Sequence, residues 1–170
     1  GNGTERSVED TVDVISNFAG DGTRSFGGDG GPATLAKLAV PVAVDVAPDG
    51  TVYIVEGNPF QAVRKVLPNG IIQSVNFTLA PGERLFDPSD INLLAAGTNN
   101  IIYLADTSDN RVRAIGIDGV LRTVAGGGTD LSEGIPATQA RLLPIIGIDV
   151  GPDESLYVAD SSCNLGQCSM

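Results

Sequence analysis

Residues 32–38 read Pro-Ala-Thr-Leu-Ala-Lys-Leu, and residues 136–142 read Pro-Ala-Thr-Gln-Ala-Arg-Leu. The shift between the two segments is 104 residues (136 − 32), and the same shift continues downstream without a gap. It carries Asp45 onto Asp149 and Tyr53 onto Tyr157. Agreement over so long a stretch indicates an internal repeat.

A third copy lies between these two. Residues 102–106, Ile-Tyr-Leu-Ala-Asp, match residues 52–56 at a shift of 50 and residues 156–160 at a shift of 54. The three tyrosines of the chain therefore occupy one repeat position, and two arginines occupy another: Tyr53, Tyr103 and Tyr157, with Arg64 and Arg113. The repeat unit is about 52 residues long.

Within one unit the apolar residues alternate with a period of two, which is typical of β-strands. Val42, Val44 and Val46 fall on one face of the first strand, and Asp49-Gly50 then signals a hairpin turn. Further strands are predicted over 52–55, 62–66 and 71–75. Four antiparallel strands per unit make a β-propeller blade, so the predicted fold class is all-β, with helix limited to a short turn around 34–38.

We expect residues 1–11 to be a linker and residues 12–170 to be the propeller segment. The segment divides into an outer strand (12–19), a blade (40–76), a second blade (90–126) and a partial blade (144–170). In the middle unit Leu94 stands where Asp45 and Asp149 predict an acid. Since a ring needs about four to eight blades, we expect a fragment of a longer polypeptide; the alternative is that neighbouring chains complete the ring.

Charge and hydropathy restrict the partners. The chain has 21 acidic and 10 basic side chains, a formal charge of −11, which argues against nucleic acid because phosphate binding needs a basic surface. No apolar run exceeds seven residues, whereas a spanning helix needs about 20, so this segment should not insert into a membrane. The amino terminus lacks the features of a signal peptide, and we expect any signal to be upstream or already removed.

Cysteine and asparagine patterns point to an oxidising compartment. Cys163 and Cys168 are the two cysteines and the chain has no histidine, so a disulfide is favoured over a zinc site or a redox motif. Asn2-Gly3-Thr4 and Asn76-Phe77-Thr78 are N-glycosylation sequons. The chain is therefore predicted to be extracellular or at the cell surface.

Several segments resemble the NHL repeat. They are Gly28-Asp29-Gly30-Gly31-Pro32-Ala33-Thr34, Pro48-Asp49-Gly50, Tyr103-Leu104-Ala105-Asp106 and Asn110-Arg111-Val112-Arg113. The resemblance extends from about Val14 to Asp160 and implies a propeller, usually of six blades. The family covers adhesion receptors, extracytoplasmic sensor domains, RNA-binding regulators and a few enzymes. Some of those enzymes hold a metal with His and acidic residues.

The repeated ionisable residues have two interpretations. Asp45 and Asp149 on first strands are expected to anchor neighbouring backbone amides, and the alternative is a Ca²⁺ site. Arg64 and Arg113 are expected to form ion pairs with nearby acids, and the tyrosines are expected to pack between blades. No catalytic residue, resident metal or cofactor is assigned.

The predicted function is a non-catalytic extracellular module of a larger glycoprotein, with a structural or protein-interaction role in a cell surface, filament or coat. Its expected partners are other protein chains, the remainder of its own polypeptide, or glycans. One alternative is a ligand-sensing domain of a membrane signalling protein. Another is a piece of a propeller enzyme whose active site lies on further blades.

Overall fold

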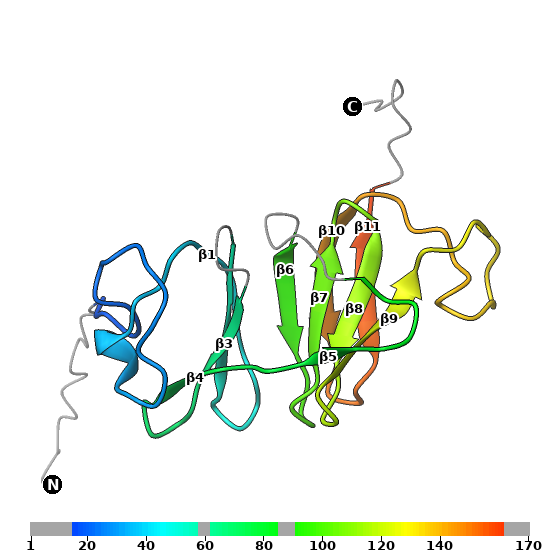
Figure 1. Cartoon of the computed structure of the whole chain (residues 1–170). Helices are drawn as coiled ribbons and strands as arrows, with labels where there is room; N and C mark the ends of the chain where they lie inside the picture. Colours follow the sequence, from blue (N-terminus) through cyan, green and yellow to red (C-terminus); the bar gives the residue numbers. More distant parts are fainter. Residues whose placement is uncertain (1–14, 58–61, 85–90, 162–170) are drawn as a thin grey trace, which may run out of the picture.

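A computed structural model describes residues 15–57, 62–84 and 91–161 (Figure 1). Within these ranges the one helical element is a single 3₁₀ turn, Ala33–Leu35. The first sheet has the order β1-β2-β3-β4, with every neighbouring pair antiparallel. Its strands are β1 (Pro41–Val46), β2 (Val52–Glu56), β3 (Ala62–Val66) and β4 (Ile72–Ser74). The prediction of an all-β chain built from four-stranded antiparallel blades is confirmed.

The second sheet repeats this order and adds a short strand at its outer edge. Its strands are β6 (Ile91–Ala96), β7 (Ile102–Asp106), β8 (Arg111–Ile115) and β9 (Val120–Gly126). β5 (Thr78–Leu79) pairs in parallel with β9. A third sheet is formed by β10 (Ile145–Val150) and β11 (Leu156–Asp160), which are antiparallel.

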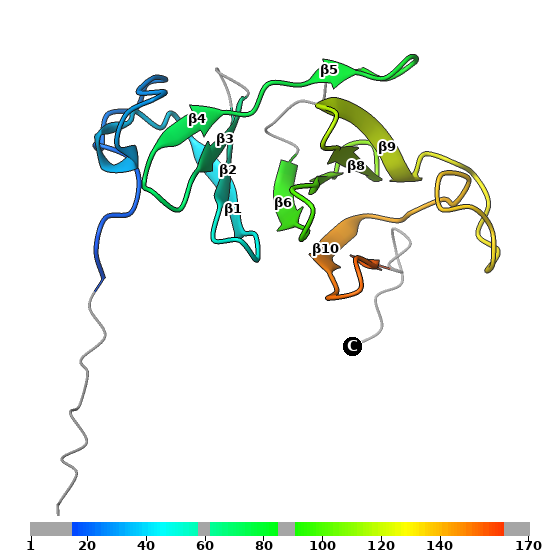
Figure 2. The same ribbon diagram turned by 90° about the horizontal axis from the view of Figure 1, so that it is seen from below.

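The three sheets stand side by side in an arc (Figures 1 and 2). Their first strands, β1, β6 and β10, lie on the inner side, with β6 in contact with both of the others. The strands β4, β5 and β9 lie on the outer side (Figure 2). This is the layout of propeller blades, in which the first strand of each blade lies nearest the ring axis.

The pairing register shows which residues are equivalent. Asp45 lies opposite Tyr53, and Asp149 lies opposite Tyr157. In the second sheet the residue opposite Tyr103 is Ala95. The placement of Leu94 at the position of the acid is therefore wrong, because the shift between the first and second copies is 50 residues along both strands and Leu94 belongs to the opposite face.

The prediction of an outer strand over 12–19 is wrong for the residues that the structure describes. Residues 15–19 are not in a strand, and residues 12–14 lie outside the described ranges. The segment that flanks β4 instead comes from the Gly-rich loop. The N–H of Gly30 donates to the carbonyl of Ile72 at 2.9 Å, and the N–H of Ile72 donates to Gly31 at 3.0 Å. The chain just before the first sheet thus covers the outer edge of that sheet, and β5 does the same for β9 in the second sheet.

Apolar clusters fill the spaces between the sheets. The largest joins the first sheet to the second and consists of Ala47, Tyr53, Val55, Val63, Ile91, Leu94, Ile102, Leu104, Ile115 and Leu121. Another joins the second sheet to the third around Ala105, Val112, Ala125 and Ile145. Because each sheet is buried on the faces that meet a neighbour, stability depends on contacts between blades as well as within them.

Candidate functional site

A fully buried arginine lies at the centre of the first sheet. Arg64 is 0% exposed and its Nη1 donates to Glu56 Oε1 at 2.8 Å, where Glu56 is also 0% exposed. Its Nη2 donates to Asp29 Oδ1 at 2.6 Å, and its guanidinium lies 4.6 Å from the ring centre of Phe26. The other oxygen of Glu56 accepts the Ala39 N–H at 2.6 Å. The predicted ion pair is present and extends to the loop that precedes β1.

Gly28 shows why this loop is rich in glycine. Its φ is +92°, a conformation that side chains disfavour, and a Cβ there would lie 2.7 Å from Ala36 Cα. A glycine is therefore required for the loop to approach the 3₁₀ turn and to deliver Asp29 to Arg64.

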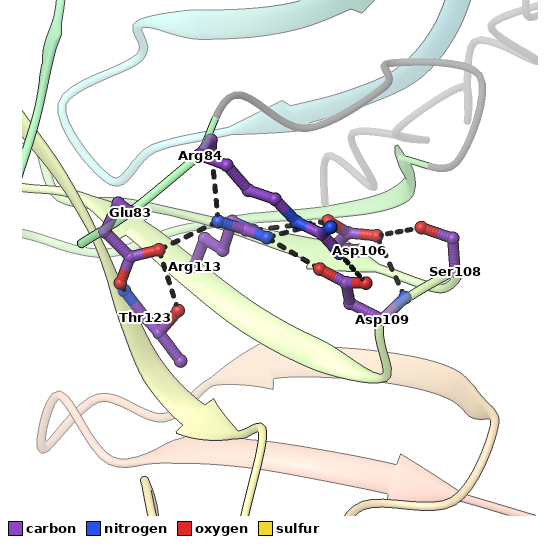
Figure 3. A network of polar contacts seen from close by, with 7 residues as sticks. All are labelled: Glu83, Arg84, Asp106, Ser108, Asp109, Arg113 and Thr123. Atoms are coloured by element: carbon purple, nitrogen blue, oxygen red, sulfur yellow. Dashed lines mark hydrogen bonds and ion pairs between the residues drawn. The ribbon is translucent and has the colours of Figure 1, made fainter.

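Arg113 has the same role in the second sheet (Figure 3). Its Nε donates to Asp106 Oδ2 at 3.2 Å, its Nη2 to Asp109 Oδ2 at 3.0 Å, and its Nη1 to Glu83 Oε2 at 2.9 Å. Arg113 is 0% exposed and Asp106 is 2% exposed. Glu83 also accepts the Thr123 N–H at 2.6 Å, and so ties the loop before β6 to β9. Each arginine is thus paired with an acid of its own β-hairpin and with an acid of the preceding loop.

Arg84, whose side chain is 70% exposed, forms an ion pair with Asp109 at the solvent-exposed side of this network (Figure 3). The pKa of Asp109 is lowered, first by the hydrogen bond from Arg84. The pKa of Asp29 is also lowered: burial opposes the shift, and the nearby polar groups of Ser74 and the Arg64 guanidinium outweigh it. Both carboxylates are therefore held in the ionised form that the arginines require.

Asp45 bridges two blades. Its Oδ2 accepts the N–H of Ala96, on β6, at 2.7 Å. Asp149 is exposed, and its Oδ1 accepts the N–H of its neighbour Val150 at 2.8 Å. Both carboxylates thus accept from backbone amides, and in the described ranges no group of three or more His, Cys, Asp or Glu side chains could hold a metal ion.

The tyrosines differ in exposure although they share a repeat position. Tyr53 is 4% exposed between the first two sheets, and its hydroxyl donates to Asn100 Oδ1 at 3.3 Å. Tyr103 is partly buried against the third sheet, and Tyr157 is 61% exposed. Burial raises the pKa of the hydroxyls of Tyr53 and Tyr103. Tyr53 and Tyr103 are thus covered by the sheet that follows them, whereas Tyr157, in the last described sheet, is exposed and does not pack between sheets in the described residues.

A polar groove of about 670 Å³ opens between the first and second sheets at their turn ends. It is lined by Thr51, Tyr53, Lys65, Gln73, Asn76 and Asn100, among others. Asn76, the asparagine of the second sequon, is exposed at this groove. Asn2, Cys163 and Cys168 lie outside the described residues. No helix in the described part of the chain has the length and apolar character of a membrane span.

Sequence reasoning missed two acids that connect elements. Glu83 takes the place of Asp29 in the second sheet, although the Pro-Ala-Thr segment that would have marked the loop is absent there. Glu154, in the turn between β10 and β11, has a φ of +65° and accepts the Thr98 N–H at 3.0 Å. Glu154 aligns with Gly50 at the shift of 104, so a non-glycine residue in a glycine position was the available signal.

Sequence comparisons connect the chain to teneurins. It is 26% identical to Teneurin-m of Drosophila melanogaster over 148 residues (78% of this chain), and 31% identical to human Teneurin-1 over 116 residues (66% of this chain). It is 28% identical to Teneurin-3 of Danio rerio over 95% of its length. The matches span 5%, 4% and 6% of these relatives, respectively.

Among solved structures, virginiamycin B lyase from Staphylococcus aureus matches 75% of this chain and 37% of its own, with a TM-score of 0.46 and 18% identity. A streptogramin B lyase matches 71% of this chain and 34% of its own, with a TM-score of 0.44 and 17% identity. No family model matches the sequence. The similarity to teneurins, which contain NHL repeats, supports an NHL-like propeller fold.

Proposed function

We propose that this chain is a non-catalytic extracellular β-propeller module of a larger glycoprotein, with a structural or protein-interaction role at a cell surface or in a filament or coat. The observation that carries the proposal is the use of the repeated ionisable side chains. Glu56, Arg64, Asp106 and Arg113 are buried in ion pairs, and Asp45 accepts a backbone amide of the next blade. Groups held in this way serve the fold and are not available as acids, bases or ligands.

The comparisons support the location. Teneurins are cell-surface proteins with extracellular domains, and this chain matches them over most of its length. An extracellular location also fits the exposed sequon at Asn76 and the disulfide that the sequence predicts between Cys163 and Cys168. The negative net charge of −11 is consistent with protein or glycan partners and opposes binding to nucleic acid.

Ligand sensing is a second candidate function, and the groove between the first two sheets favours it. Its lining offers the Lys65 ammonium and the side-chain amides of Gln73, Asn76 and Asn100. Such groups bind sugars or other polar ligands through hydrogen bonds. A glycan attached to Asn76 would lie at the same groove and would compete with such a ligand.

Secretion tests the proposal. We expect the chain, produced in a eukaryotic secretory pathway, to be exported with a glycan on Asn76. The reason is that Asn76 is exposed and is followed by Thr78 at the required spacing. Peptide mass spectrometry measures occupancy at Asn76 and the state of Cys163 and Cys168. Thr78→Ala should remove the glycan, whereas Asn69→Gln, at an exposed asparagine outside any sequon, should not.

Export without a glycan at Asn76 and with free thiols would contradict the extracellular assignment. The extracellular assignment would also be contradicted if the wild-type chain were retained and degraded inside the cell and the Thr78→Ala variant met the same fate.

A further inference from the structure

The groove between the first and second sheets contains polar side chains that the described chain leaves without partners. Tyr53 pairs with Lys65 and Lys65 pairs with Gln73 across β2, β3 and β4, so the three residues form one row on the face that meets the second sheet. Lys65 and Gln73 are partly buried, and neither side chain forms a hydrogen bond or ion pair within residues 15–57, 62–84 and 91–161. Partly buried polar groups of this kind are normally paired with water or a ligand when the protein supplies no partner.

The second sheet completes the groove with an apolar floor and one further amide. Ile102 and Ile115, which are 1% and 2% exposed, line the groove. Asn100 accepts the Tyr53 hydroxyl through its Oδ1, and among the described residues its Nδ2 has no acceptor. An apolar floor with a few polar groups, in a volume of about 670 Å³, is typical of a site for a small polar molecule.

Asn76 lies at the edge of this groove on a fixed stretch of backbone. It belongs to the link between β4 and β5, where the chain passes from the first sheet to the second (Figure 2). On one side of it the Val75 N–H donates to the Val63 carbonyl at 2.7 Å, and on the other the Thr78 N–H donates to the Gly119 carbonyl at 2.8 Å. Because Asn76 is exposed and lines the groove, a glycan on its side-chain nitrogen starts at the groove.

We infer that the glycan on Asn76 folds back into this groove and binds there as a bridge between the first and second sheets. The sugars next to the asparagine of an N-linked glycan are N-acetylglucosamines. Their hydroxyl and acetamido groups both donate and accept hydrogen bonds, and so match the Lys65 ammonium and the amides of Gln73 and Asn100.

Covalent attachment makes this glycan the favoured occupant of the groove. A short tether gives a ligand an effective concentration of the order of mM at its site, so weak contacts are sufficient to hold it. The inference deepens the function proposed above and rests on it, since it requires a glycosylated, extracellular chain.

A double-mutant cycle between the glycan and the groove tests the inference. Urea unfolding measures the equilibrium constant for unfolding of the secreted, glycosylated chain and of its Thr78→Ala variant. We expect Thr78→Ala to raise this constant about tenfold, because the hydrogen bonds of the glycan are lost. Lys65→Met keeps the aliphatic part of the side chain and removes the ammonium. In the Lys65→Met background, Thr78→Ala should raise the constant no more than about threefold.

Matched variants control for effects that do not involve the groove. Lys37→Met makes the same substitution at the other lysine of the chain, which is exposed and outside the groove, so the tenfold effect of Thr78→Ala should persist there. Gln73→Leu repeats the test at a second groove residue, with Gln139→Leu, at an exposed residue, as its control. Thr78→Ser keeps the sequon and should unfold as the wild type does.

A free sugar distinguishes the attached glycan from a saccharide of another molecule. N,N′-diacetylchitobiose, at a concentration of the order of 10 mM, should shift the side-chain amide resonances of Gln73 and Asn100 in Thr78→Ala. It should not shift them in the glycosylated chain, where the groove is already occupied. Equal shifts in both forms would overturn the inference and assign the groove to saccharides from outside.

An equal effect of Thr78→Ala in the Lys65→Met and Lys37→Met backgrounds would overturn the inference, as would no effect in the wild type. In both cases peptide mass spectrometry would still find the glycan on Asn76, so failure here is distinguishable from failure of the proposed function. An exported chain without a glycan on Asn76 would overturn both.

Discussion

Replacement of Glu56 by alanine is expected to lower the free energy of unfolding by about 3–5 kcal/mol, because it leaves the Arg64 guanidinium buried without its main counter-charge. The substitution also leaves the Ala39 N–H without its carboxylate acceptor. Both side chains of the ion pair are 0% exposed, so the guanidinium is out of contact with bulk water in the folded chain. Urea unfolding followed by circular dichroism measures the change.

The matched control is Arg122→Ala. Arg122 and Asp118 also form an arginine–carboxylate pair, at 2.6 Å, but their side chains are 44% and 49% exposed. Loss of an exposed pair should cost no more than about 1 kcal/mol. Equal losses for the two variants would contradict a structural role for the buried arginine.

Leu104→Ala is expected to destabilise the chain by about 2–5 kcal/mol, through lost burial and the cavity that it leaves. Leu104 is 0% exposed in the cluster that joins the first sheet to the second. The same measurement on Ile117→Ala, at a side chain that is 81% exposed, should show a change within about 0.5 kcal/mol. A Leu104→Ala variant as stable as Ile117→Ala would show that the sheets do not depend on this contact.

The fold was predictable because the repeat signals are local. The two-residue period of 42–46, the Asp49-Gly50 turn and the repeated tyrosines each follow from strand and turn geometry, and the described strands carry them. The pairing of Arg64 with Glu56 was also predictable, because adjacent antiparallel strands bring residues eight apart across a short hairpin.

Contacts between distant segments could not be predicted from a single sequence. The sequence around Glu83 does not mark this residue as the counterpart of Asp29, because the middle unit has lost the Pro-Ala-Thr segment. The equivalence is seen only in the structure, where each carboxylate pairs with the buried arginine of its sheet. The misplacement of Leu94 had a different cause. A two-residue period turns an error of one residue into the wrong face of the strand. The shift of 50 residues carries Asp45 onto Ala95, and the pairing of Ala95 with Tyr103 agrees with it.

The central claim is that the repeated acids serve the fold, through ion pairs and hydrogen bonds to backbone amides, and do not bind a ligand. A calcium-dependent thermal unfolding measurement tests it most directly. Extracellular modules bind Ca²⁺ with dissociation constants of about 10⁻⁴–10⁻³ M, and a bound ion raises the unfolding midpoint. We predict the same midpoint in a chelator and in about 1 mM Ca²⁺, since Asp45 is already engaged with the Ala96 N–H. A midpoint that rises with Ca²⁺ in the wild type, and no longer rises in Asp45→Asn, would contradict the claim.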